Sequence, residues 1–122
     1  MTTKLTVNAL YVCVFDMQRA RHFYETRIFG RPPVSNSDRF SAFDINGFLF
    51  CLFAPAVEGE PHQIGNNCVA TIETDDLDSL LQSCEQSDIR IHRPPRTVDG
   101  MRLFQILDSE DNIVEFYQQL NP

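Results

Sequence analysis

One series of features occurs twice in this chain of 122 residues, and the repetition limits the folds that the chain can adopt. Segments 16–25 and 76–85 have equal length, and each opens with an aspartate and ends with a glutamate. Both have the apolar spacing of a helix behind a capping residue, and a Pro-Pro pair follows each of them. A supersecondary unit that occurs twice is the simplest explanation.

Both halves also end in a β-hairpin pattern. In the first half Asn46-Gly47 separates two apolar runs, which is a strong signal for a two-residue turn. In the second half an acidic, Asn-containing turn at 108–112 separates two runs with alternating apolar side chains.

The remaining elements follow from alternation, helical spacing and turn residues. The first half is expected to contain a strand at 5–15, a helix from Asp16 to about residue 28 that ends at Gly30, a polar turn at 35–38, and strands at 40–45 and 48–53. The second half is expected to contain a strand at 68–74, a helix capped by Asp75 or Asp76, a short strand at 89–92, a rigid exit at Pro94-Pro95, and strands at 101–107 and 113–117.

These elements predict an α+β fold of two βαβββ modules whose curved sheets surround a shared cleft. One helix covers only one face of its sheet, so the other face has to be buried elsewhere or line a cavity. We expect a single domain over residues 1–122, with module one at about 5–54, a linker at about 55–67 and module two at about 68–120.

Charge and composition exclude several kinds of partner. The formal net charge of −7 argues against nucleic acid or an anionic membrane surface. No run is apolar enough to span a bilayer and the N-terminus lacks a secretory signal, so we expect a cytoplasmic protein. Cys13, Cys51, Cys68 and Cys84 have no metal-binding or redox spacing and are expected to be reduced thiols.

Glu115 is the residue whose position favours chemistry most. It lies in the last predicted strand, with the apolar Ile113 and the aromatic Tyr117 two residues away on the same face. A carboxylate in that setting can bind a ligand or act in catalysis. The alternative is a glutamate on the solvent-exposed face of an edge strand.

Alternation predicts which side chains share the face of Glu115. A face of this composition suits a planar or partly cationic organic ligand, although the same side chains would also fill a two-sided core. Arg102 is a further candidate ligand-binding residue, whose face the sequence leaves open. The predicted inward residues are Tyr11, Cys13, Leu49, Cys51, Phe53, Thr71, Glu73, Glu115 and Tyr117.

Four stretches carry a resemblance to a known family. Residues 12–17, 22–25, 100–104 and 108–115 resemble the glyoxalase/bleomycin-resistance/dioxygenase group, the vicinal oxygen chelate superfamily. The resemblance covers nearly the whole chain. It implies paired βαβββ modules, a ligand cavity inside the curved sheets, and commonly a homodimer.

The resemblance also implies where metal ligands would lie. In metal-dependent members one ligand comes from the first strand and one from the last strand of each module, and these positions are Ala9, Cys51, Val69 and Glu115 here. Only Glu115 is a ligand of the usual family type. We therefore expect no cofactor, with a divalent metal as the alternative.

Two functions follow from this resemblance. The first is a metal-independent protein that binds a small organic molecule in an apolar cleft, as in drug or metabolite sequestration. The alternative is a metal-dependent lyase, isomerase or ring-cleaving dioxygenase that uses Glu115, with further donors from Cys13, Cys51, Glu73 or His92. A third reading is an accessory domain that serves only dimerisation. A homodimer is expected in each case.

Overall fold

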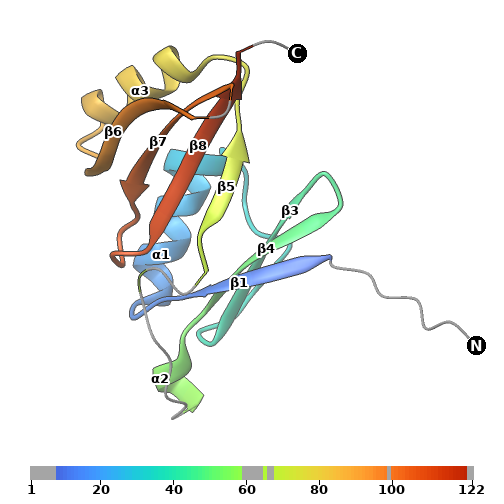
Figure 1. Cartoon of the computed structure of the whole chain (residues 1–122). Helices are drawn as coiled ribbons and strands as arrows, with labels where there is room; N and C mark the ends of the chain where they lie inside the picture. The colour runs from blue at the N-terminus through green and yellow to red at the C-terminus, as the bar shows by residue number, and fades with distance from the viewer. Residues whose placement is uncertain (1–7, 59–64, 66–67, 99, 121–122) are drawn as a thin grey trace, which may run out of the picture. The chain divides into compact units, whose positions relative to one another are not determined.

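A computed structural model describes residues 8–58, 65, 68–98 and 100–120 of the chain (Figure 1). The chain divides into two compact units, Met1–His62 and Gln63–Pro122, and each contains one four-stranded sheet. Among the described residues, none of the helices has the length and apolar character needed to cross a membrane.

The first sheet has the strand order β1-β4-β3-β2. β1 pairs with β4 in parallel, and the other neighbours are antiparallel. Its unit contains β1 (Ala9–Cys13), α1 (Met17–Phe23), the π-helical segment η1 (Tyr24–Phe29), β2 (Ser35–Asn36), β3 (Phe40–Ile45), β4 (Phe48–Phe53) and the short helix α2 (Pro55–Glu58).

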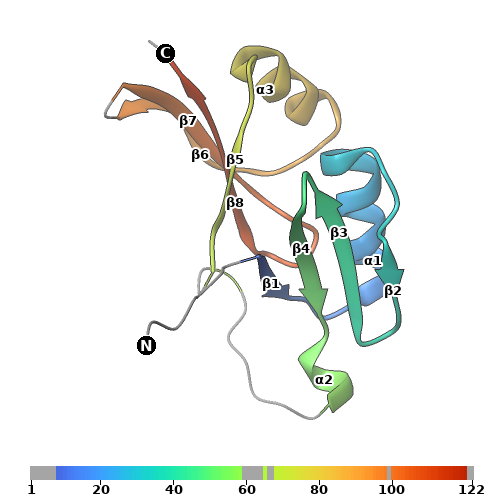
Figure 2. The ribbon, with the colours of Figure 1, turned by 90° about the vertical axis from the view of Figure 1, so that its right-hand side faces the viewer.

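The second sheet has the equivalent order, β5-β8-β7-β6, again with its first strand parallel to its last. Its unit contains β5 (Ala70–Glu73), α3 (Leu77–Gln86), β6 (Ile91–Val98), β7 (Met101–Leu107) and β8 (Ile113–Gln119). Each sheet has its main helix on one face (Figure 2). The duplicated βαβββ architecture that the sequence predicts is confirmed.

The first helix begins and ends at the predicted signals. The Asp16 carboxylate accepts a hydrogen bond from the Arg19 backbone N–H at 3.0 Å, and Gly30 ends the helix in the left-handed region at φ 66°. The last turns are π-helical, which the sequence pattern does not predict. They bring Phe29 to a stacked position on the fully buried Tyr24, with ring centroids 5.9 Å apart. Phe43 and Phe50 complete this aromatic core.

Asp76, rather than Asp75, caps the second helix. Its carboxylate accepts from the Ser79 backbone N–H at 3.1 Å and from the Ser79 hydroxyl at 2.8 Å. The side chain of Gln118 also holds this end of the helix, because it accepts from the Leu77 N–H and donates to the Asp75 carbonyl, both at 2.9 Å.

Two predictions that bear on the second strand of each module are wrong. The short strand at 89–92 and the rigid exit at Pro94-Pro95 are replaced by β6, which runs through both prolines. Prolines are tolerated here because β6 is an edge strand and its pairing with β7 shifts register around them. In the first module the polar turn at 35–38 contains a strand, β2, which pairs with β3.

Other boundaries differ by less. The first strand, predicted at 5–15, covers Ala9–Cys13, and residues 5–7 lie outside the described part of the chain. The linker at 55–67 begins with the helix α2, and most of its remainder lies outside the described residues. The hairpin at Asn46-Gly47 is confirmed, with both residues at positive φ.

The thiols should differ in reactivity. Cys13, Cys51 and Cys84 are buried, and burial raises the pKa of all three thiols, whereas Cys68 is half-buried. We expect an Ellman-type reagent to modify one of the four thiols rapidly in the native protein and the other three slowly. Denatured protein, in which all four react at once, is the control, and rapid native labelling of all four would contradict the burial.

The Asp76 cap should make stability depend on pH. Hydrogen bonds from the backbone N–H and hydroxyl of Ser79 lower the pKa of Asp76 from its ordinary value of 3.8. The stabilisation by the cap is therefore complete above pH 3.8, and it is lost as the pH falls through the lower pKa of the folded state. D76A should unfold at lower urea than wild type at neutral pH, and the difference should shrink in acid. D76N keeps an acceptor oxygen at this position but has no carboxylate to titrate. If D76N lost as much stability as D76A, the result would argue against the cap.

Candidate functional site

The second sheet has one apolar face and one mixed face, called the polar face for its hydrogen-bonded side chains, which also carries Leu103, Leu107 and Ile113. Phe104, Ile106, Val114 and Phe116 are buried on the face toward α3, which contacts β8. Side chains alternate along a strand, so Glu115 lies on the opposite, open face. This placement agrees with the face that alternation predicts for it.

Glu115 lies at the centre of a row of polar side chains across three strands. It pairs in register with Thr71 of β5 and with Gln105 of β7. The Thr71 hydroxyl donates to Glu115 Oε2 at 2.5 Å, and Gln105 Nε2 donates to Glu115 Oε1 at 3.0 Å. Both carboxylate oxygens are therefore oriented by the sheet itself, while the side chain stays half-buried and accessible.

A second row lies next to the first on the same face. Glu73 of β5 is opposite Tyr117 of β8, which is opposite Leu103 of β7. Glu73 is exposed and Tyr117 is half-buried. The structure thus brings together Thr71, Glu73, Glu115 and Tyr117, four of the residues that the sequence predicts for the site.

Gln105 is a site residue that the sequence pattern does not single out. A glutamine in a strand has no distinctive pattern of its own. The hairpin could have identified it. Leu107 and Ile113 flank the turn, and counting outward from this pair places Gln105 opposite Glu115. Its amide makes a direct hydrogen bond to the carboxylate, so it belongs to the candidate site.

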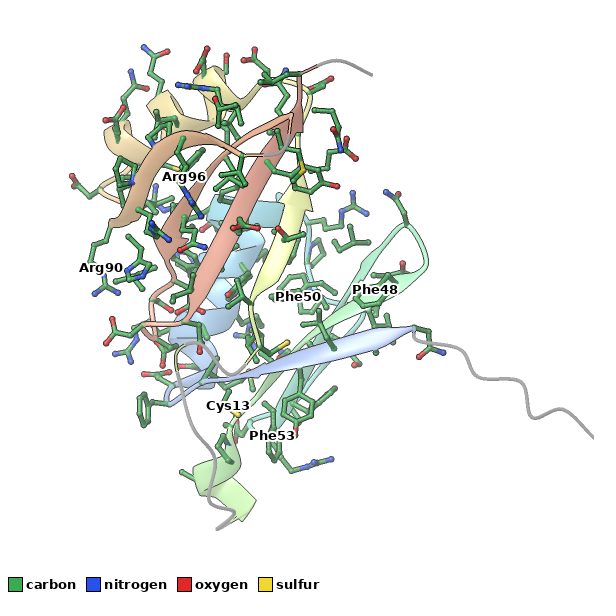
Figure 3. The ribbon with its side chains drawn as sticks, in the orientation of Figure 1. Cys13, Phe48, Phe50, Phe53, Arg90 and Arg96 are labelled. Carbon is green, nitrogen blue, oxygen red and sulfur yellow. The ribbon has the colours of Figure 1, made fainter. Side chains whose placement is uncertain are left out.

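The face of the first sheet away from α1 has a different character, and three of its predicted site residues, Cys13, Cys51 and Phe53, are buried. Tyr11 is in register with Cys51, and Cys13 with Phe53, so these four predicted residues share one face of the sheet. Cys13 and Phe53 are labelled in Figure 3. The Tyr11 and Phe53 rings meet edge to face with centroids 5.3 Å apart. Burial raises the pKa of the Cys13 and Cys51 thiols, so both remain neutral near pH 7. This face is aromatic and apolar.

Arg102 is not placed with these residues. It is opposite Gln118 on β8, on the same side of the second sheet as α3. Its guanidinium lies 3.4 Å from the Asp78 carboxylate on α3 in an exposed ion pair. The structure therefore separates Arg102 from Glu115 and Glu73.

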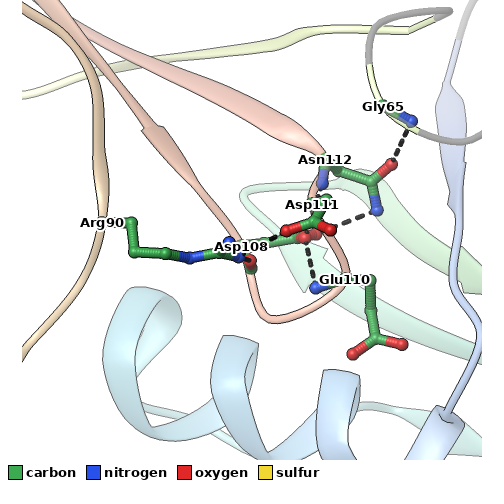
Figure 4. A network of polar contacts seen from close by, with 6 residues as sticks. All are labelled: Gly65, Arg90, Asp108, Glu110, Asp111 and Asn112. Atoms are coloured by element: carbon green, nitrogen blue, oxygen red, sulfur yellow. Dashed lines mark hydrogen bonds and ion pairs between the residues drawn. The ribbon is translucent and has the colours of Figure 1, made fainter.

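The turn between β7 and β8 sets the register of the polar rows (Figure 4). The buried Asp108 carboxylate accepts from the backbone N–H groups of Glu110 and Asn112 through Oδ1, at 2.7 and 2.8 Å, and from the Asn112 side-chain amide through Oδ2, at 3.0 Å. Asp111 takes the left-handed conformation at φ 68°. A slip of one residue in this hairpin would move Glu115 to the face of α3.

Two neighbouring segments hold the same turn. Arg90 donates to the Asp108 carbonyl at 2.8 Å and pairs with the Asp111 carboxylate at 2.7 Å (Figure 4). On the other side, Gly65 donates to Asn112 Oδ1 at 3.0 Å, and its carbonyl accepts from the Ile113 N–H at 3.0 Å. These contacts anchor the start of β8 to residues before β5 and before β6.

The residues at the four predicted ligand positions do not fit a metal centre. Ala9 and Val69 carry no donor atom, and Cys51 is a buried thiol whose pKa is raised. A divalent site needs three or four converging donors. Within the described part of the chain, no group of three or more His, Cys, Asp or Glu residues could hold an ion.

The duplicated βαβββ units define a class of protein built on paired modules with a helix on one face of each sheet. The chain belongs to the Glyoxalase/Bleomycin resistance protein/Dioxygenase superfamily, whose sequence profile matches residues 6–116. None of the curated proteins matches the sequence significantly.

Solved structures are similar over nearly the full length. A glyoxalase/bleomycin resistance protein/dioxygenase from Nocardioides is 16% identical with a TM-score of 0.80, over 99% of this chain and 87% of that one. Lactoylglutathione lyase from Agrobacterium tumefaciens is 18% identical with a TM-score of 0.80, over 96% of both chains. A virulence protein from Salmonella typhimurium is 20% identical with a TM-score of 0.75, over 97% of this chain and 99% of that one. At these identities the similarity establishes the fold alone.

Replacing Asp108 tests the role of the turn. D108A leaves two buried backbone N–H groups without their acceptor, so we expect a loss of about 2–4 kcal/mol in the free energy of unfolding. D111N is the matched control, because it removes only an exposed ion pair and keeps a side chain that tolerates positive φ. It should cost at most about 1 kcal/mol. Equal losses in urea unfolding would show that the Asp108 contacts do not hold the turn.

Proposed function

We propose that this protein binds a small organic ligand on the polar face of the second sheet, without a metal, as in sequestration of a drug or metabolite. The ligand presents a cationic or hydrogen-bond-donating group to Glu115. Tyr117, beside Glu115 on the same strand, supplies an aromatic surface on which a planar group can stack.

The arrangement of Glu115 supports this proposal most directly. A carboxylate with one oxygen held by Thr71 and the other by Gln105 is oriented before a ligand arrives, so little side-chain entropy is lost on binding. Each oxygen has a further lone pair for a ligand donor. The nearby Glu73 adds a second negative charge to this face, which favours a cation over an anion next to Glu115.

The donor set supports the metal-free part of the proposal. Three of the four ligand positions carry Ala9, Val69 and the buried Cys51. The alternative, a metal-dependent lyase, isomerase or dioxygenase, would require donors that this set does not provide.

A substitution at Glu115 tests the binding proposal. With benzylamine as the cationic probe, E115Q should weaken binding by about 1.5 kcal/mol, the lower end for a hydrogen bond to a charged group, because Glu115 is half-buried. E85Q is the control, since it makes the same charge change on the exposed surface of α3. Titration followed by NMR chemical shifts gives both affinities. Equal affinities for wild type, E115Q and E85Q would overturn the assignment of Glu115.

Elemental analysis tests the absence of a metal. The purified protein should contain no stoichiometric transition metal, and treatment with a chelator should leave benzylamine binding unchanged. A stoichiometric metal that is lost in E115Q would overturn the metal-free proposal and favour the enzyme.

We further propose that the protein is a homodimer, because each short module leaves one sheet face without a helix of its own. The chain has a mass of 14.0 kDa, and light scattering at micromolar concentration should give twice this mass. A monomer at every concentration would contradict this.

A further inference from the structure

The two polar rows on the second sheet extend beyond Glu115 and Glu73 to the edge strand β6. Arg93 pairs in register with Gln105, and Arg96 pairs with Leu103. The first row therefore contains Thr71, Glu115, Gln105 and Arg93, and the second contains Glu73, Tyr117, Leu103 and Arg96.

An irregularity in β6 is what places both arginines on one face. Residues three apart in a regular strand point to opposite sides. Here the register shifts between Arg93 and Arg96. These two residues are three positions apart in β6, but their partners in β7 are only two positions apart. The two prolines between the arginines occupy this irregularity. As a result both arginines share the face of Gln105 and Leu103.

These arginines differ from the other cations of the second unit. Arg90 holds the β7–β8 turn and Arg102 pairs with Asp78. Arg93 and Arg96 are exposed, and within the described residues neither has a hydrogen-bond or ion-pair partner. In the view of Figure 3 the Arg96 side chain projects over the strands of the sheet, whereas Arg90 extends outward from its edge.

The open face therefore has two charged ends. Its acids lie on β5 and β8, and its unpaired cations lie on β6. Glu115 and Arg93 are two strands apart, which corresponds to about 10 Å between their backbones. Long side chains can lean inward, so two charged groups of one small molecule can reach both ends.

We infer that the ligand of this site is amphoteric: a cationic group is bound by Glu115, and an anionic carboxylate or phosphate group is bound by Arg93 and Arg96. This inference rests on the proposed function and specifies the class of ligand. Guanidinium groups suit both anions, because their paired N–H donors match two oxygens of a carboxylate or phosphate.

A matched set of probes tests the inference. 4-(Aminomethyl)benzoate carries both charges on one ring, benzylamine carries only the cation, and 4-methylbenzoate carries only the anion. The phosphonate analogue of the first probe distinguishes the two kinds of anion. Binding is measured by NMR titration against wild type, R93Q/R96Q and E115Q. R21Q/R27Q is the charge-matched control, with both substitutions on the helical segment of the first unit.

The amphoteric probe should bind wild type about fivefold or more tightly than benzylamine, since about 1 kcal/mol is typical for an exposed charge pair. In R93Q/R96Q the affinity of the amphoteric probe should fall to that of benzylamine for the same variant, and benzylamine itself should bind no more weakly than to wild type. E115Q should weaken both of these probes, and R21Q/R27Q should affect neither. Tighter binding of the phosphonate than of the carboxylate would identify a phosphate-type ligand.

Two failures are distinguishable. If benzylamine binding depends on Glu115 but the anionic group adds no affinity and R93Q/R96Q has no effect, the amphoteric inference is overturned and the proposed function stands. If none of the probes binds in a manner that depends on Glu115, the proposed function fails and the inference fails with it. An equal loss in R21Q/R27Q would assign the effect to net charge and would also overturn the inference.

Discussion

The buried carboxylate of Asp108 is the constraint on which the second unit depends. It accepts three hydrogen bonds within its own turn, and this turn fixes how β7 lies against β8. The side-chain period of a strand is two residues, so the register decides which residues face α3 and which face away. The position of Gln105 beside Glu115, and hence the orientation of the carboxylate, follows from a contact in the turn, three residues along the chain from Gln105.

Much of the fold was predictable because its signals are local. The caps at Asp16 and Asp76, the Asn46-Gly47 turn and the alternation in β8 each act within a few residues. The edge strand β6 was not predictable, because its two prolines argue against a strand unless the neighbouring chain is known. Of the candidate site, the face of Glu115 followed from alternation. Gln105 required the register of the hairpin, and Arg93 and Arg96 required the pairing of β6 with β7, which the Pro94-Pro95 pair by itself does not give.

The two modules show how one topology supports different surfaces. Tyr11, Cys51 and Ala42 form a row in the first sheet that is equivalent to Thr71, Glu115 and Gln105 in the second. The first row is largely apolar, and the second is polar and hydrogen-bonded. The cores differ as well, since Tyr24 and three phenylalanines fill the first, whereas α3 contributes Leu77 and Cys84 to the second. Backbone pairing is independent of these choices, so each face could diverge without loss of the fold.

The lengths of the two edge strands affect how the sequence of such a protein can evolve. β2 has two residues and β6 has eight, although they occupy the same place in their sheets. An edge strand has a neighbour on one side only, so insertions and prolines there leave the central strands and the helix packing intact. The rim of the second sheet can therefore acquire new charges through mutations that cost little stability. Selection for a new ligand would act first on this strand, while the buried turn and the paired strands remain as they are.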